Sequence, residues 1–130
     1  MGGFQKSFAE VAKIQLSGPR QKIYCSLTRL RVIRIFMNGR FEWDNNKAAS
    51  NWRNHGVTFD QAVKAINDPF AIDWIDDREA YGEERINLLG MCDGILLHVT
   101  YMARGERIRI ISARRAERHE QDDYYRENSF

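Results

Sequence analysis

The sequence is poor in cysteine and has no long apolar segment, and each shortage excludes a class of protein. The two cysteines of the 130-residue chain, Cys25 and Cys92, form no CxxC pair. They support neither a disulfide framework nor a thiolate zinc site, and they indicate a reducing, cytoplasmic compartment. No apolar run approaches the roughly 20 residues needed to span a bilayer, so we expect neither a membrane-spanning protein nor a membrane partner.

Proline is also scarce, and both prolines stand at breaks in the chain. Pro19 follows Ser17 and Gly18, and Pro69 follows Asp68 at the predicted end of a helix. The remaining sequence can form a core, because 43% of the residues are hydrophobic and 29% are charged. The length predicts one domain, and no internal repeat divides it.

The net charge of +2 conceals two oppositely charged parts. Residues 1–40 contain eight basic residues and one acidic residue, a net charge of +7, whereas twelve basic and seventeen acidic residues give residues 41–130 a net charge of −5. The basic part lacks the uninterrupted apolar core of about 7–15 residues that a secretory signal needs. We expect residues 1–40 to be a basic N-terminal extension, poorly ordered over residues 1–36, with Met37 as an alternative natural start. Residues 41–130 then form the folded domain.

Two helices are predicted at the start of this domain. Asp44 can cap a helix that runs through about His55, with Gly56 as its stop. Its inward face is expected to carry Ala48, Trp52 and His55. Residues 58–61, with the letters TFDQ, match a capping box and open a second helix through about residue 67. The predicted inward residues of the second helix are Phe59, Ala62, Val63 and Ile66.

Strands and a last helix follow. The predicted strands cover residues 71–75, 84–91, 95–102 and 106–111, with a hairpin turn at Asp93-Gly94 and another turn at Gly105. Ser112 can cap a helix over about residues 114–126, which has few apolar residues and is expected to be half exposed, mobile or used by a partner. The order predicts an α+β fold: an antiparallel twisted sheet of three to four strands, two N-terminal helices and a C-terminal helix. The helices are expected over one face, and the arginines on the other.

Several ordered motifs resemble one protein family. They are Phe41-Glu42-Trp43-Asp44, His55-Gly56-Val57, Gly82-Glu83-Glu84-Arg85 and residues 107–116 with the letters RIRIISARRA. Over about residues 41–125 the chain resembles BrnT-type toxins of type II toxin–antitoxin systems. The resemblance implies a RelE-like fold, a ribonuclease that inhibits translation, and no cofactor. It also implies a BrnA-type ribbon-helix-helix antitoxin as partner, which binds operator DNA on behalf of the complex.

The arginines suit cleavage of RNA without a metal. The 2′-hydroxyl of RNA can attack the neighbouring phosphate and leave a 2′,3′-cyclic phosphate, and the planar, permanently charged guanidinium can stabilise the crowded phosphate. With the resemblance, we favour this role for Arg85 and Arg114 over mere solvation. Arg114 is expected at the start of the last helix. For Arg107, Arg109 and Arg115, RNA binding and a solvated sheet face are equally good interpretations.

The other candidate site residues are weaker. His55 could carry a proton or could pack at a helix C-terminus, and Lys47 and Arg53 could contact RNA phosphates or simply be exposed. His98 is expected in the core or at its edge and His119 in solvent, and the three histidines lack metal-ligand spacing.

The aromatic residues are predicted to be structural. Trp43, Trp52 and Trp74 are more often core residues than platforms for bases, and Tyr124 and Tyr125 are expected to pack the last helix onto the sheet rather than stack on RNA.

Two alternative functions remain open. The domain could be a non-catalytic antitoxin-binding co-repressor, because residues 41–130 are acidic overall and because Asn54 and Glu117 stand where the family pattern has a lysine and a small hydroxyl residue. A topoisomerase poison is also conceivable within the superfamily, but no residue favours it.

Overall fold

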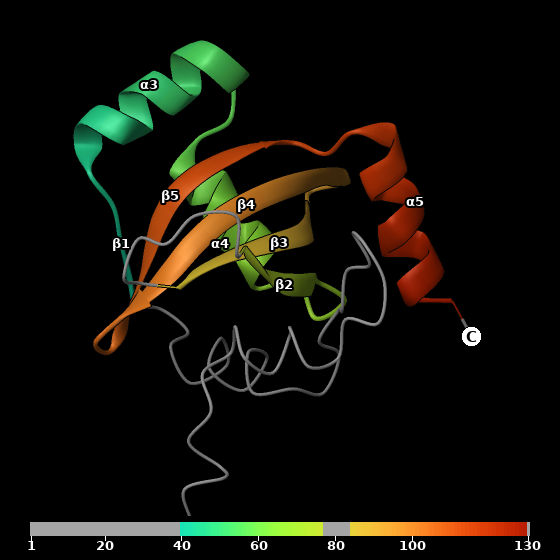
Figure 1. Cartoon of the computed structure of the whole chain (residues 1–130). Helices are drawn as coiled ribbons and strands as arrows, with labels where there is room; N and C mark the ends of the chain where they lie inside the picture. Colours follow the sequence, from blue (N-terminus) through green and yellow to red (C-terminus); the bar gives the residue numbers. More distant parts are fainter. Residues whose placement is uncertain (1–39, 77–83, 130) are drawn as a thin grey trace, which may run out of the picture.

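The structure, a computed structural model, describes residues 40–76 and 84–129. The elements are β1 (Phe41–Glu42), α3 (Asn45–His55), α4 (Phe59–Ile66), β2 (Ile72–Asp76), β3 (Arg85–Cys92), β4 (Ile95–Arg104), β5 (Arg107–Arg115) and α5 (Arg118–Glu127). Figure 1 shows one twisted sheet with helices around it. Residues 1–39 of the predicted extension, including Met37, lie outside the described residues, as do Gly82 and Glu83 of the third motif.

The sheet has five strands in the order β1-β5-β4-β3-β2. The four long strands form antiparallel pairs, whereas β1 runs parallel to β5, with Phe41 opposite Ile108 and Glu42 opposite Arg109. The α+β class is confirmed. The expectation of three to four antiparallel strands is wrong, because the sheet has a fifth, short strand that runs parallel to its neighbour. Two residues are too few to show an alternating pattern, so β1 could not be recognised by periodicity.

The first two helices begin and end where their capping residues predict. The Asp44 side chain accepts a hydrogen bond from Asn46 N at 2.7 Å, and Gly56 ends α3 in the left-handed region with φ of 66°. At α4, Gln61 N donates to Thr58 Oγ1 at 3.1 Å and Thr58 N donates to Gln61 Oε1 at 2.9 Å, which completes the predicted capping box.

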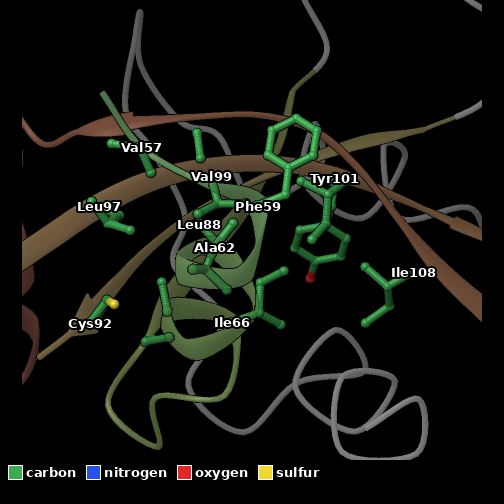
Figure 2. Close-up of a cluster of buried hydrophobic side chains, with 14 of the residues drawn as sticks. Val57, Phe59, Ala62, Ile66, Leu88, Cys92, Leu97, Val99, Tyr101 and Ile108 are labelled. Atoms are coloured by element: carbon green, nitrogen blue, oxygen red, sulfur yellow. The ribbon is translucent and has the colours of Figure 1, made fainter. Parts of the chain in front are cut away.

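The main core lies between the sheet and α4 (Figure 2). It contains the inward residues of α4 together with alternate residues of the strands, among them Phe59, Ala62, Ile66, Leu88, Val99, Tyr101 and Ile108. The helix approaches β3 so closely that a β-carbon at Gly90 would collide with the backbone carbonyl of Ala65. This contact fixes the layer of α4 against the centre of the sheet.

Helix α3 is attached to the β5 edge of the sheet through Asn51, which is buried. Asn51 Nδ2 donates to the carbonyls of Val57 and Ala113 at 2.9 and 2.8 Å, and Ala113 N donates to Asn51 Oδ1 at 3.0 Å. The amide therefore pairs the β5 backbone where β1 has ended. Since Ala48 and Asn51 take the inward positions, the prediction that Trp52 faces the core is wrong, and its side chain is 57% exposed.

Helix α5 differs most from expectation. It begins at Arg118, four residues after the predicted start, because β5 continues through Ser112 and Arg114 in register with Thr100 and His98. Helix α5 lies on the sheet face opposite α4, at the end of the sheet where β5 finishes (Figure 1). Its buried residue Tyr124 packs in a second cluster with Ile72, Trp74, Leu89 and Leu96. The helices therefore cover both faces, and the expectation of one covered face is wrong.

Within the part of the chain that the structure describes, no helix is long and apolar enough to cross a membrane.

Candidate functional site

The arginines of the strands gather on the sheet face opposite α4, which we call the arginine face. Ile86 and Leu88 of β3 point into the main core, so Arg85 lies on the other side of the strand. The same alternation in β5 places Arg107 and Arg109 opposite Ile108 and Ile110. This sharing of one face was predicted from the sequence pattern.

A β-bulge brings Arg114 to the same face. Tyr101 pairs with Ile110 and Thr100 pairs with Ser112, so Ile111 is an extra residue in β5. Beyond this bulge the alternation of β5 is inverted, which turns Arg114 toward the arginine face and Ala113 toward the main core. Arg114 is a strand residue, and the expectation that it starts the last helix is wrong.

One row of side chains crosses the arginine face near the β4–β5 turn. Asp76 pairs with Arg85, and Met102 and Glu42 both pair with Arg109. Ile86 pairs with Tyr101 in the antiparallel register, so the preceding residue, Arg85, stands opposite the following one, Met102. Arg85 and Arg109 therefore lie on either side of Met102. Two strand spacings separate their α-carbons by roughly 10 Å, which long guanidinium side chains can span from both sides. Two arginines can therefore converge above Met102.

Arg109 is linked to a carboxylate at the edge of the sheet. Its Nη1 donates to Glu42 Oε2 at 2.8 Å, and the two side chains are 26% and 27% exposed. The remaining guanidinium N–H groups of Arg109 can bind a phosphate oxygen while this hydrogen bond persists.

The next row toward α5 is polar. Asn87, Thr100 and Ser112 stand in register on neighbouring strands, and Thr100 Oγ1 donates to Asn87 Oδ1 at 2.7 Å. These short side chains form a floor between the two arginines of the first row and the region that α5 covers.

Arg114 lies in the third row and is clamped by α5. Its Nη1 and Nη2 donate to Glu120 Oε1 and Oε2 at 2.7 and 3.0 Å, a bidentate pair. The Arg114 side chain is 34% exposed and that of Glu120 is 4% exposed. His98, which pairs with Arg114 across the strands, has its Nε2 at 3.7 Å from Glu120 Oε2. Three charged or titratable side chains therefore join α5 to the sheet.

The clamp keeps both of its partners ionised. The hydrogen bond to Glu120 raises the pKa of Arg114 despite partial burial. Burial acts to raise the pKa of Glu120, but the hydrogen bonds from Arg114 and the Glu117 backbone, with the nearby His98, outweigh it, and the pKa of Glu120 is lowered.

Arg114 does not share one phosphate with the first row. Four residue steps along β4 separate Met102 from His98, or about 13 Å at the usual rise of a strand. Arg85, Arg109 and Arg114 thus share a face but reach different points along a bound chain.

The remaining predicted site residues lie elsewhere. Lys47, Arg53 and His55 are exposed on α3, and Arg53 Nη2 donates to Ser50 Oγ at 3.2 Å. Arg115 is exposed on the side of β5 that carries Ala113. The structure does not bring these four residues to the arginine face, and the side chain of His55 is exposed rather than packed.

The aromatic and histidine predictions are confirmed except at Trp52 and Tyr125. Trp43 packs edge-on against Phe59, Trp74 packs edge-on against His98, and Tyr124 is buried, whereas Trp52 is exposed. Tyr125 is 57% exposed. His119 is exposed beside Glu117, as expected for a solvated helix.

Sequence analysis missed two carboxylates of the site. Glu42 belongs to a strand too short to recognise, and Glu120 lies on a helix whose start was misplaced. The spacing of Glu117 and Glu120 could have revealed the start of α5, because Glu117 N donates to Glu120 Oε1 at 2.8 Å, as at a helix N-terminus. Across the described ranges, no group of three His, Cys, Asp or Glu residues could hold a metal ion.

Comparison with known proteins identifies the family. A search of curated proteins found no match. The family model described as the ribonuclease toxin, BrnT, of type II toxin–antitoxin systems matches residues 43–120, which include Arg85, Arg109, Arg114 and Glu120. Because this match spans more than half of the chain, the protein belongs to the BrnT family, the ribonuclease toxins of type II toxin–antitoxin systems.

Proposed function

We propose that this toxin is a metal-independent endoribonuclease that binds RNA on the arginine face. The observation that carries the proposal is the placement of Arg85 and Arg109 on either side of Met102, beside the polar floor of Asn87, Thr100 and Ser112. The 2′-hydroxyl of the bound RNA attacks the adjacent phosphate and leaves a 2′,3′-cyclic phosphate.

The arginines supply the charge stabilisation that this reaction needs. As the 2′-oxygen adds to phosphorus, negative charge grows on the non-bridging oxygens, and Arg85 and Arg109 donate to them from two sides. One well-placed donor of this kind contributes about 3–4 kcal/mol to the lowering of the barrier. The guanidinium is a permanent cation, and its hydrogen bonds strengthen as the negative charge grows, so it stabilises the transition state more than the bound substrate.

In this proposal the other predicted residues contact RNA away from the phosphate that is cleaved. Arg114, fixed by Glu120, contacts a phosphate further along the RNA, and Arg107 extends the basic surface toward the β4–β5 turn. Lys47, Arg53 and Arg115 contact RNA beyond the sheet face. His55, which the sequence suggested for proton transfer, is exposed on α3 outside this face, and a catalytic role would require the RNA to extend to it.

The cellular role follows from the family. A type II toxin is neutralised by a protein antitoxin, and we propose a BrnA-type ribbon-helix-helix protein as this partner. Cleavage of messenger RNA inhibits translation until the antitoxin binds. Operator DNA is then contacted through the antitoxin.

The test is cleavage of a labelled RNA by purified protein in EDTA. The wild type should cut the RNA to 2′,3′-cyclic phosphate ends, and Arg85→Ala should reduce kcat by roughly 10²–10³-fold, as expected for loss of one transition-state donor. Arg126→Ala is the matched control, because Arg126 is exposed on α5 and pairs with Asp123 away from the sheet. An RNA with a 2′-deoxynucleotide at the cut site should resist cleavage. Cutting of that substrate, or full activity of Arg85→Ala, would contradict the proposed chemistry.

The non-catalytic co-repressor stays a second candidate on one observation. Arg109 and Arg114 each pair with a carboxylate, so part of the positive charge of the arginine face is neutralised within the protein. A co-repressor would bind the antitoxin tightly and leave RNA intact with and without divalent metal. Multiple turnovers by catalytic amounts of protein exclude it.

A further inference from the structure

The chemistry proposed above needs a group that accepts the proton of the 2′-hydroxyl, and the residues predicted from the sequence leave this role unfilled on the arginine face. We infer that Glu42 is this general base and that Arg109 holds the scissile phosphate beside it. The inference rests on the proposed function and adds a catalytic residue to it.

Glu42 is held firmly at the edge of the sheet. It belongs to β1, which pairs with β5 in parallel, and Ile108 N donates to the carbonyl of Arg40 at 2.7 Å just before the strand. Phe41 packs against the main core, so alternation directs Glu42 to the arginine face. Figure 1 shows β1 running along the outer edge of β5. The backbone at and just before Glu42 is thereby anchored to β5.

The carboxylate of Glu42 is both positioned and accessible. Its Oε2 accepts the hydrogen bond from Arg109, whereas within the described residues Oε1 accepts none, and about a quarter of the side chain is exposed. A proton acceptor must lie within hydrogen-bond reach of the group that it deprotonates. If other N–H groups of Arg109 bind a non-bridging phosphate oxygen, the 2′-hydroxyl adjacent to that phosphate can reach Oε1.

The other carboxylates of this face are less suited to act beside Arg109. Asp76 lies on β2, three strands away from Arg109. Glu120 is 3% exposed, both of its oxygens accept hydrogen bonds from Arg114, and Oε1 also accepts from Glu117 N. These bonds leave it no access to a 2′-hydroxyl. The charged groups near Glu42 are Arg109, in direct contact, Arg107, two residues earlier on the same face of β5, and Arg40 and Asp44, two residues before and after Glu42 in the chain.

In the proposed step, one bond to phosphorus forms as another breaks. The 2′-oxygen forms a bond to phosphorus as its proton passes to Glu42 Oε1, and the bond from phosphorus to the 5′-oxygen breaks. The 5′-oxygen takes a proton from water, and Glu42 returns its own proton to solvent. The products are a 2′,3′-cyclic phosphate and a 5′-hydroxyl, with no oxidant, reductant or metal required.

The experiment compares the wild type with Glu42→Gln in single-turnover cleavage of RNA across pH, beside RNA binding and thermal unfolding. The amide oxygen of Gln can still accept from Arg109 but cannot take a proton. We expect kcat to fall by roughly 10²–10⁴-fold, the usual contribution of general acid–base catalysis, with RNA affinity changed less than threefold. The wild-type rate should fall toward acid pH with unit slope, and this acidic limb should be absent from Glu42→Gln.

The matched control is Glu106→Gln. Glu106 also pairs with an arginine, Arg40, at 3.1 Å, but it is exposed at the β4–β5 turn, and within the described residues its side chain bonds to neither Arg85 nor Arg109. Its activity and pH profile should equal those of the wild type. A Glu42→Gln protein that keeps the acidic limb and loses less than tenfold in kcat overturns the assignment of Glu42.

A modified substrate separates the base from other roles. With sulfur in place of the bridging 5′-oxygen, the leaving group needs no proton, so Glu42→Gln should remain impaired if Glu42 acts on the 2′-hydroxyl. Restoration of the rate would assign Glu42 to the leaving group and refute our inference. Failure of the wild type to cleave any RNA would instead contradict the proposed function, so the two failures are distinguishable.

Discussion

The pairing of Arg114 with Glu120 predicts a specific loss of stability at neutral pH. Glu120→Gln keeps the shape of the side chain but removes the charge that holds Arg114 and leaves one oxygen where two now accept. Loss of one partner from a fully buried ion pair costs about 3–5 kcal/mol. Since the Arg114 side chain is 34% exposed and can turn to water, we expect a smaller loss of about 2 kcal/mol in the free energy of unfolding.

The sign of the pH dependence follows from the lowered pKa of Glu120. A carboxylate that is more acidic in the folded state than in the unfolded state stabilises the fold above its unfolded pKa, near 4.5, and this contribution is lost as pH falls through the folded value. The stability difference between the wild type and Glu120→Gln should therefore be full at pH 7 and shrink below about pH 4.5.

Urea unfolding at pH 7 and at several acidic values measures this difference. Glu127→Gln serves as the control, because Glu127 is an exposed residue of the same helix, and its stability should stay within about 0.5 kcal/mol of the wild type. A loss under about 0.5 kcal/mol for Glu120→Gln, or a difference that does not change with pH, would refute the reasoning.

Two further predictions concern buried hydrogen bonds. Asn51→Ala removes three hydrogen bonds and leaves the Ala113 backbone groups unpaired at the β5 edge. The free energy of unfolding should therefore fall by about 2–4 kcal/mol, whereas the exposed control Asn54→Ala should lose about 0.5 kcal/mol or less. Equal losses in urea unfolding would contradict the proposed role of the Asn51 amide. Tyr124→Phe removes the bond from the hydroxyl to Asp68 Oδ2 at 2.6 Å and should cost about 1–2 kcal/mol, because Asp68 keeps its bonds from Phe70 N and Met91 N. Burial, together with that bond, raises the pKa of Tyr124, so this part of the stability is present below the unfolded value of about 10 and is lost as pH rises above it. Unfolding of the two proteins from pH 8 to pH 11 should show this alkaline loss in the wild type alone, and the same loss in Tyr124→Phe would refute the assignment.

Helix α5 shows why a polar helix can be misread from its sequence. Its few apolar residues predicted weak attachment, yet Tyr124 and Glu120 are buried, and each is bonded to another part of the fold. Asp68, read from the sequence as a helix terminator, accepts the Tyr124 hydroxyl 56 residues away. Composition measures how much apolar surface a helix can bury, but it does not reveal polar partners from distant segments.

Features that depend on neighbouring residues could be predicted from the amino-acid sequence. The caps at Asp44 and Thr58, the Asp93-Gly94 turn and the alternation that puts Arg85, Arg107 and Arg109 on one side of their strands are all local effects of backbone geometry and short-range hydrogen bonds. The tertiary structure decided which charged groups meet. Glu42 reaches Arg109 across 67 residues because a two-residue strand finds the free edge of β5, and a bulge at Ile111 turns Arg114 toward Glu120. These contacts depend on strand pairing and register, which are set by the packing of the whole sheet and leave no periodic trace in the chain.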